Sequence, residues 1–114
     1  MSLNDTPIIQ KNYDFLRYLI PILNRFPKSH KFLLADRIQS RVLDNQEKLI
    51  EAYYAPSSEK QALLRQINLS LEQLRFLIRL CHDLQLLDHS RYEHISRMIN
   101  EIGAMLGGWI KSLK

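Results

Sequence analysis

Residues 59–87 read EKQALLRQINLSLEQLRFLIRLCHDLQLL, and their apolar side chains recur every three or four positions. This spacing puts the apolar residues on one face of an amphipathic helix. Residues 55–58, APSS, are the clearest break in the chain, and Ser58 with Gln61 forms a capping-box pattern. We therefore predict one helix over residues 59–87. Its apolar stripe comprises Leu63, Ile67, Leu71, Leu74, Ile78, Cys81 and Leu84, widened by Phe76, Leu77 and Leu80.

Two further helices are predicted before this stretch. The first begins at a cap formed by Asp5 or Thr6 and ends within residues 24–27. Pro21 lies inside its pattern and is expected to kink or break it. The second runs from residue 27 or 28 to residue 54. Their apolar stripes are Ile9, Leu16, Leu19, Ile20 and Leu23 in the first, and Leu34, Ile38, Val42, Leu49 and Tyr53 in the second.

A fourth helix is predicted to begin at Asp88 or Ser90, where Ser90 and Glu93 form a second capping-box pattern. Gly107 and Gly108 are expected to fray or cap its end. Four long amphipathic helices joined by three short breaks predict an all-α fold, an antiparallel up-down-up-down four-helix bundle that forms one domain over residues 1–114. The fourth apolar stripe is Ile95, Met98, Ile99, Ile102, Leu106 and Trp109.

Composition excludes several classes of protein. Apolar residues make up 46% of the 114 residues and charged residues 25%, which is typical of a folded domain rather than a disordered chain. One cysteine excludes an intramolecular disulfide and a zinc site built on several thiolates. The sequence shows neither a signal-peptide pattern nor a run of about 18 apolar residues, so we expect no membrane segment and a cytoplasmic protein.

The net charge of +4 is spread evenly along the chain, so a binding face must come from folding. Many basic residues have an acidic partner three or four positions away, as Arg41 has Asp44. Those without such a partner are Arg25, Lys28, Lys31, Arg37, Lys60, Arg65, Lys111 and Lys114. The topology puts Arg25, Lys28 and Lys31 beside the turn between the last two helices. There they form a basic pole with His30, His82, His89 and Arg91. Lys60, Lys111 and Lys114 fall at the opposite pole. A basic pole attracts phosphate backbones.

Two groups of residues resemble catalytic or metal-binding patterns. Arg25 and His30 have the spacing of the motif of the HEPN ribonucleases, in which histidine acts as acid or base and arginine stabilises phosphate charge. This ribonuclease is one alternative function. The run Cys81-His82-Asp83 resembles metal or nucleophile material, but Cys81 lies on the apolar stripe, where a buried, unreactive thiol is the default. We predict no metal, no cofactor and no catalytic residue for the leading function.

Residues 102–112, IGAMLGGWIKS, carry the most specific resemblance to a known family. They resemble the accessory variability determinant (Avd) proteins of diversity-generating retroelements. This family lies within the four-helix-bundle superfamily that includes ribosomal intervening-sequence proteins. Within this run, Gly103 and Gly107 suggest a close approach between helices, and Trp109 is an apolar anchor. Other matching pieces are RFPK at 25–28, EAYYA at 51–55, LRFLIRL at 74–80, and Tyr92.

The resemblance implies a non-enzymatic scaffold, assembled as a pentameric barrel, that binds a reverse transcriptase and its template RNA during mutagenic cDNA synthesis. The basic positions of the family's third helix correspond to Arg75 and Arg79. Surplus apolar surface, including Phe76 and Tyr54, also suggests self-association. A helical protein-interaction module without an RNA role stays open as a second alternative. The predicted partner-binding and nucleic-acid-binding residues are Arg25, Lys28, Lys31, Arg37, Arg65, Arg75 and Arg79.

Overall fold

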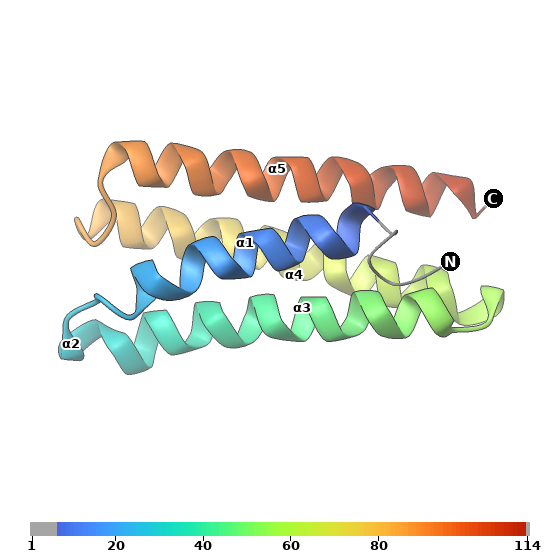
Figure 1. Cartoon of the computed structure of the whole chain (residues 1–114), viewed down its shortest axis with the longest axis horizontal. Helices are drawn as coiled ribbons and strands as arrows, with labels where there is room; N and C mark the ends of the chain where they lie inside the picture. The colour runs from blue at the N-terminus through green and yellow to red at the C-terminus, as the bar shows by residue number, and fades with distance from the viewer. Residues whose placement is uncertain (1–6, 114) are drawn as a thin grey trace.

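The structure is a computed structural model that describes residues 7–113 (Figure 1). The predicted caps Asp5 and Thr6 lie outside these residues. Within them, no helix is both long and apolar enough to cross a bilayer. The elements in chain order are α1 (Pro7–Leu23), α2 (Lys28–His30), the π-helix η2 (Lys31–Ala35), α3 (Asp36–Tyr54), α4 (Ser57–Asp83) and α5 (His89–Ser112).

The four long helices form an antiparallel bundle, as predicted. α3 packs against α1 and α4, and α5 packs against α4 and α1, so each helix contacts its two neighbours around the bundle. The molecule measures 43 × 22 × 19 Å, with the helices running along the long axis (Figure 1). This arrangement brings the turn after α1 and the turn after α4 to the same end, which is the left-hand end in Figure 1.

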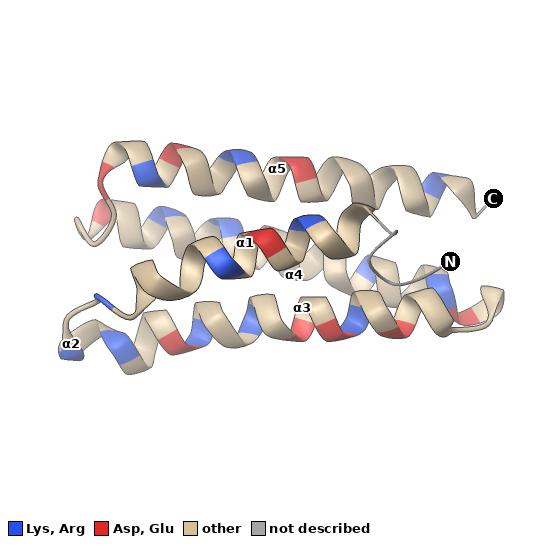
Figure 2. Ribbon diagram, viewed as in Figure 1, with Lys and Arg blue, Asp and Glu red and all other residues tan. Residues whose placement is uncertain are grey.

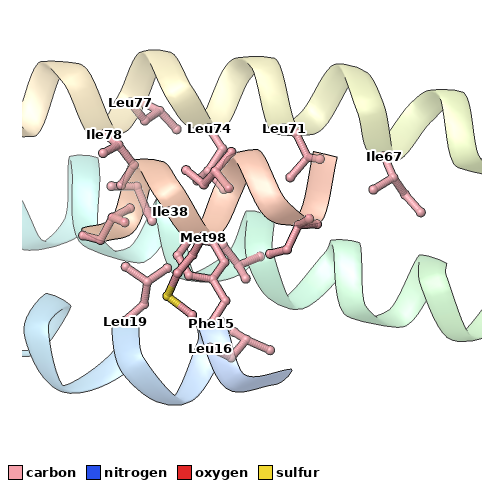
Figure 3. Packing of buried hydrophobic residues seen from close by; sticks show 14 of the residues in the cluster. Phe15, Leu16, Leu19, Ile38, Ile67, Leu71, Leu74, Leu77, Ile78 and Met98 are labelled. Atoms are coloured by element: carbon pink, nitrogen blue, oxygen red, sulfur yellow. The ribbon is translucent and has the colours of Figure 1, made fainter. Parts of the chain in front are cut away.

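The core is a continuous set of apolar side chains contributed by all four long helices (Figure 3). Most predicted stripe residues are buried, among them Leu16, Ile38, Leu74 and Ile99. Phe76, from the widened stripe, is an error because it is 67% exposed, and Leu84 is an error because it is 46% exposed and lies beyond the helix. For Leu84 the reason is that α4 ends at Asp83 and not at residue 87.

The end of α4 has the geometry of a Schellman motif. Gln85 has a positive φ of 63°, its N–H donates to the His82 carbonyl, and the Leu86 N–H donates to the Cys81 carbonyl. Glycine is the usual residue at such a position, so neither Gln85 nor Leu84 marks a helix end in the sequence. The apolar stripe continues past this end because Leu87 turns back into the core.

Both predicted capping boxes are wrong. α4 begins at Ser57, one residue before the predicted cap, and the Pro56 carbonyl accepts the N–H groups of Glu59 and Lys60. Asp88 caps α5, since its side chain accepts the Arg91 N–H at 2.7 Å.

Neither Pro21 nor the pair Gly107 and Gly108 ends its helix. α1 continues through Pro21 to Leu23, because the proline lies in the last turn and Leu23 is buried beyond it. α5 continues through Gly107 and Gly108 to Ser112, because Trp109 and the apolar residues after it still pack against the core.

The predicted helix from residue 28 to residue 54 is continuous, but its start contains the π-helical segment η2. In this segment Leu34 and Ala35 are buried, whereas Phe32 is 81% exposed and Leu33 is 61% exposed. Short π-helical segments inside helices are frequent at functional sites. Here the segment presents two adjacent apolar side chains to solvent.

Two amide side chains are built into the contact between α1 and α3. Asn12 is buried, and its Nδ2 donates to Gln46 Oε1 at 2.8 Å and to the Val42 carbonyl at 3.4 Å. Gln46 Nε2 in turn donates to the Ile9 carbonyl at 3.2 Å. Buried polar groups are tolerated when they are paired in this way.

A salt bridge between Lys11 on α1 and Glu101 on α5 makes stability depend on pH. The hydrogen bond from Lys11 lowers the pKa of Glu101 below its ordinary value of 4.5, and the charges of Lys11, Arg97 and His94 act in the same direction. A carboxyl with a depressed pKa stabilises the fold above 4.5 and loses that contribution as pH falls through its folded value. We expect Lys11→Met to lower the melting temperature at neutral pH but not at the acidic end. A constant difference in melting temperature between the two proteins, measured by circular dichroism across this pH range, would contradict the linkage.

Candidate nucleic-acid interface

Basic side chains gather around the turn after α1, at one end of the bundle. Arg25, in the turn after α1, and Arg91, in the first turn of α5, line one hollow of about 180 Å³. Lys28 and Lys31 follow on α2 and η2. Residues 25–35 contain no acidic side chain, and Figure 2 shows basic residues without acidic ones around α2. We call Arg25, Lys28 and Lys31 the basic end, and its predicted place beside the turn after α4 is confirmed.

Aromatic and histidine rings cover the neighbouring corner of the same end. The His82 ring stacks on Tyr92, with centroids 4.2 Å apart, and lies 5.6 Å from the His89 ring. His89 Nε2 lies 3.0 Å from a carboxylate oxygen of Glu93. The prediction that histidines gather at this end is therefore confirmed for His82 and His89. His30 takes part in none of these contacts.

The pair Arg25 and His30 does not form a ribonuclease-like arrangement in the protomer. Arg25 is exposed and faces the hollow shared with Arg91, whereas His30 does not line that hollow. Among residues 7–113 no hydrogen bond or ring contact joins the two side chains. No observation on the protomer favours this alternative.

Arg75 on α4 is held by neighbouring side chains rather than free. It bonds to Glu72, as the spacing predicts, and its Nε and Nη2 donate to Asn100 Oδ1 on α5 at 3.3 and 3.2 Å. Gly103 makes room for this contact, because a Cβ built there would lie 3.1 Å from Arg75 Nη2. At Gly103, α5 therefore lies close to the guanidinium group of Arg75.

The other predicted packing residues on α5 behave differently from one another. No atom of another described element lies within 4 Å of a Cβ built at Gly107, so no close approach between helices is found there. Trp109 is half-buried and packs against the core, as predicted. Gly107 therefore leaves an open strip on α5.

The remaining predicted binding residues lie on α3 and α4. Arg37 and Arg65 are exposed and form no ion pair within the described part of the chain. Arg79 is exposed and lies 3.9 Å from Asp83, in the predicted pairing. Such an exposed pair contributes only about 0.2–1 kcal/mol and can be exchanged for another anion.

The structure adds three residues that the sequence reasoning missed, Arg41, Asn45 and Lys48. Together with Arg37 they line the α3 side of a groove between α3 and α4, with an open volume of about 430 Å³. Arg41 was predicted to pair with Asp44, but it bonds to Gln73 across the groove. Asn45 could have been found from the sequence, because it is a polar residue at a position that continues the apolar spacing of Ile38, Val42 and Leu49.

One of the lysines predicted for the opposite end has a structural use. Lys60, in the first turn of α4, donates to the carbonyls of Ala52 and Tyr53 at 2.7 and 2.9 Å and so closes the end of α3. Cations commonly satisfy the last carbonyls of a helix in this way. Lys111 is exposed in the last turn of α5, and Lys114 lies outside the described residues.

The single cysteine is buried and unreactive. Burial raises the pKa of the Cys81 thiol to about 11, so almost no thiolate is present at neutral pH. No group of three metal-ligating side chains comes together in the part of the chain that the structure describes.

Comparison with known proteins identifies the family. None of the curated proteins matches the chain. The bAvd-like family matches it over residues 7–113, which covers all four helices, the basic end and the groove. The chain therefore belongs to the bAvd-like family, an Avd-like family of accessory, non-catalytic scaffold proteins of retroelements.

Proposed function

We propose that the protein is an oligomeric accessory scaffold, a homopentamer, that binds the reverse transcriptase of a retroelement and its template RNA during mutagenic cDNA synthesis. Family membership over residues 7–113 is the observation that carries this proposal. The protein would act in the cytoplasm, where a free thiol such as that of Cys81 stays reduced.

The basic end supports the RNA part of the proposal. Arg25 and Lys28 are exposed and form no ion pair within residues 7–113, and Lys31 is half-buried beside them. Because they lie at one end, several copies gathered around an axis would place these cations on one rim. The combined field would attract a phosphate backbone more strongly than the +4 of one chain.

The exposed side chains of η2 support the assembly part. Phe32 and Leu33 adjoin Lys31 and present apolar surface that one protomer does not cover. Adjacent exposed apolar residues of this size mark interaction surfaces in folded proteins. We assign them to the contact between copies of the chain, which would put the basic end at the rim of that contact.

Co-expression tests the whole proposal. The tagged chain, produced with the reverse transcriptase encoded beside it and the template RNA, is expected to purify with both. Light scattering is expected to give the mass of a closed oligomer, with five copies of the chain. A complex with enzyme but without RNA would favour the interaction-module alternative. A monomer at micromolar concentration that retains neither partner would remove the proposal.

RNA binding by the purified chain is expected to depend steeply on salt. Each phosphate neutralised on a single strand contributes about 0.7 to the slope of log affinity against log salt concentration. Titrations of the template RNA at several salt concentrations give that slope. A slope near zero would exclude binding through phosphates.

A further inference from the structure

The groove between α3 and α4 is a second basic feature, separate from the basic end. Two adjoining hollows, of about 430 and 420 Å³, share Arg37, Arg41 and Gln73 and so form one continuous groove. The first hollow extends to Lys48, and the second extends to Phe76. From Arg37 to Lys48 the helix rises by about 16 Å, a length that accommodates several nucleotides of an extended strand.

Two donors in this groove have no acceptor among the described residues. Asn45 is only 2% exposed, and its Nδ2 has no hydrogen-bond partner. Nε of Arg41 is also buried and unpaired, although Nη1 of the same side chain donates to Gln73 Oε1. Buried donors are nearly always satisfied, so two unsatisfied donors one helical turn apart indicate that a ligand rich in acceptor atoms completes the site.

The charge of the groove selects an anionic ligand. Its lining carries Arg37, Arg41 and Lys48 against two carboxylates, those of Asp44 and Glu72, and Glu72 is already paired with Arg75. Neither Arg37 nor Lys48 forms an ion pair with any described residue, so their charges are available. A phosphodiester supplies both negative charge and several acceptor oxygens, and arginine binds it through paired N–H groups.

An exposed aromatic ring lies in the same groove. Phe76 is 67% exposed and lines the second hollow with Arg37 and Arg41. A cationic groove with an aromatic platform is the combination by which proteins bind single-stranded nucleic acid, since any unstacked base can lie on the ring. A duplex keeps its bases stacked and offers none to Phe76.

We propose that the α3–α4 groove binds an unpaired stretch of RNA, with phosphates between Arg37, Arg41 and Lys48 and a base stacked on Phe76. This inference rests on the proposed function and adds to it the form of RNA that this surface takes. The basic end and the groove then contact different parts of one RNA.

The test compares charge-matched variants. Arg37→Gln with Lys48→Gln removes two groove cations, whereas Arg17→Gln with Arg97→Gln removes two exposed cations from α1 and α5, outside the groove. The probes are a fluorescent oligouridylate and its duplex with oligoadenylate, followed by anisotropy. We expect wild type to prefer the single strand. The groove variant is expected to lose about 1.4 from the salt slope, because two phosphate contacts at about 0.7 each disappear. The control variant should keep the wild-type slope.

Aromatic variants test the stacking contact separately. Phe76→Ala is expected to weaken oligouridylate binding about fivefold or more without changing the salt slope, and Phe76→Trp should restore it. Tyr54→Ala, which removes an exposed ring outside the groove, should bind as wild type does. Circular dichroism and light scattering of each variant check the fold and the assembly.

Four results would overturn the inference. The first is that wild type binds the single strand and the duplex with equal affinity, and the second is that the groove and control charge variants change the salt slope equally. The third is that polyglutamate competes for the protein as well as oligouridylate does. The fourth is that the groove variants change the mass of the oligomer. The last would assign the groove to a subunit contact. If wild type binds template RNA while the groove variants are unaffected, the proposed function stands and only this inference fails. If wild type binds no RNA, both fail.

Discussion

Replacing Phe15 by alanine is expected to lower the free energy of unfolding by about 3–5 kcal/mol. The Phe15 side chain on α1 is fully buried in the core, where it lies with Leu19 and Met98 (Figure 3). The substitution removes buried apolar surface and leaves a cavity that the rigid bundle closes only in part. Total stabilities of such domains are about 5–15 kcal/mol, so the loss is a large part of the whole. Urea denaturation followed by circular dichroism measures it.

Tyr13→Ala on the same helix is the control, because the Tyr13 side chain is exposed. Its effect should stay within about 0.5 kcal/mol. If Phe15→Ala were as mild as Tyr13→Ala, α1 could not be packed against the other helices as the structure has it.

Phe32→Ser combined with Leu33→Ser is expected to dissociate the proposed oligomer. Burial of an apolar side chain of this size contributes about 1.5–3 kcal/mol, so two lost contacts weaken association by about a hundredfold or more. Folding should be unaffected, because both side chains are exposed in the protomer. Light scattering over a range of protein concentrations measures the change in mass.

Tyr54→Ser serves as the matched control, since Tyr54 is 70% exposed and is the last residue of α3, at the opposite end of the molecule. This variant should assemble as wild type does. If the double variant also keeps its mass, the contact between copies lies elsewhere. A double variant that unfolds would show that Phe32 and Leu33 support the protomer itself.

The helices were predictable because their signals are local. Spacing of apolar residues identified four helices, and the break at 55–58 and the residues around Asp88 fixed the antiparallel order. The position of the basic end followed from that order alone. Short-range ion pairs such as Arg75 with Glu72 were also predictable, because residues three positions apart on a helix lie close to each other.

The groove was not predictable from the same signals. Arg41 has a carboxylate three residues away, yet it bonds to Gln73, 32 positions along the chain, and only the packing of α3 on α4 decides between them. The π-helical segment was missed for a similar reason. Its hydrogen bonds differ from those of an α-helix by one residue, and nothing in the side chains of Lys31–Ala35 marks that difference.

The amides of Asn12 and Gln46 fix the position of α1 along the axis of α3. Apolar side chains alone would tolerate a displacement of α1 by one turn along α3, since Leu16, Leu19 and Leu23 could exchange places. Such a shift would leave the buried Asn12 amide and the half-buried Gln46 amide without their partners, so only one longitudinal alignment satisfies both. Because Arg25 is attached to the far end of α1, this alignment also fixes its distance from Arg91 and from the cations that follow it.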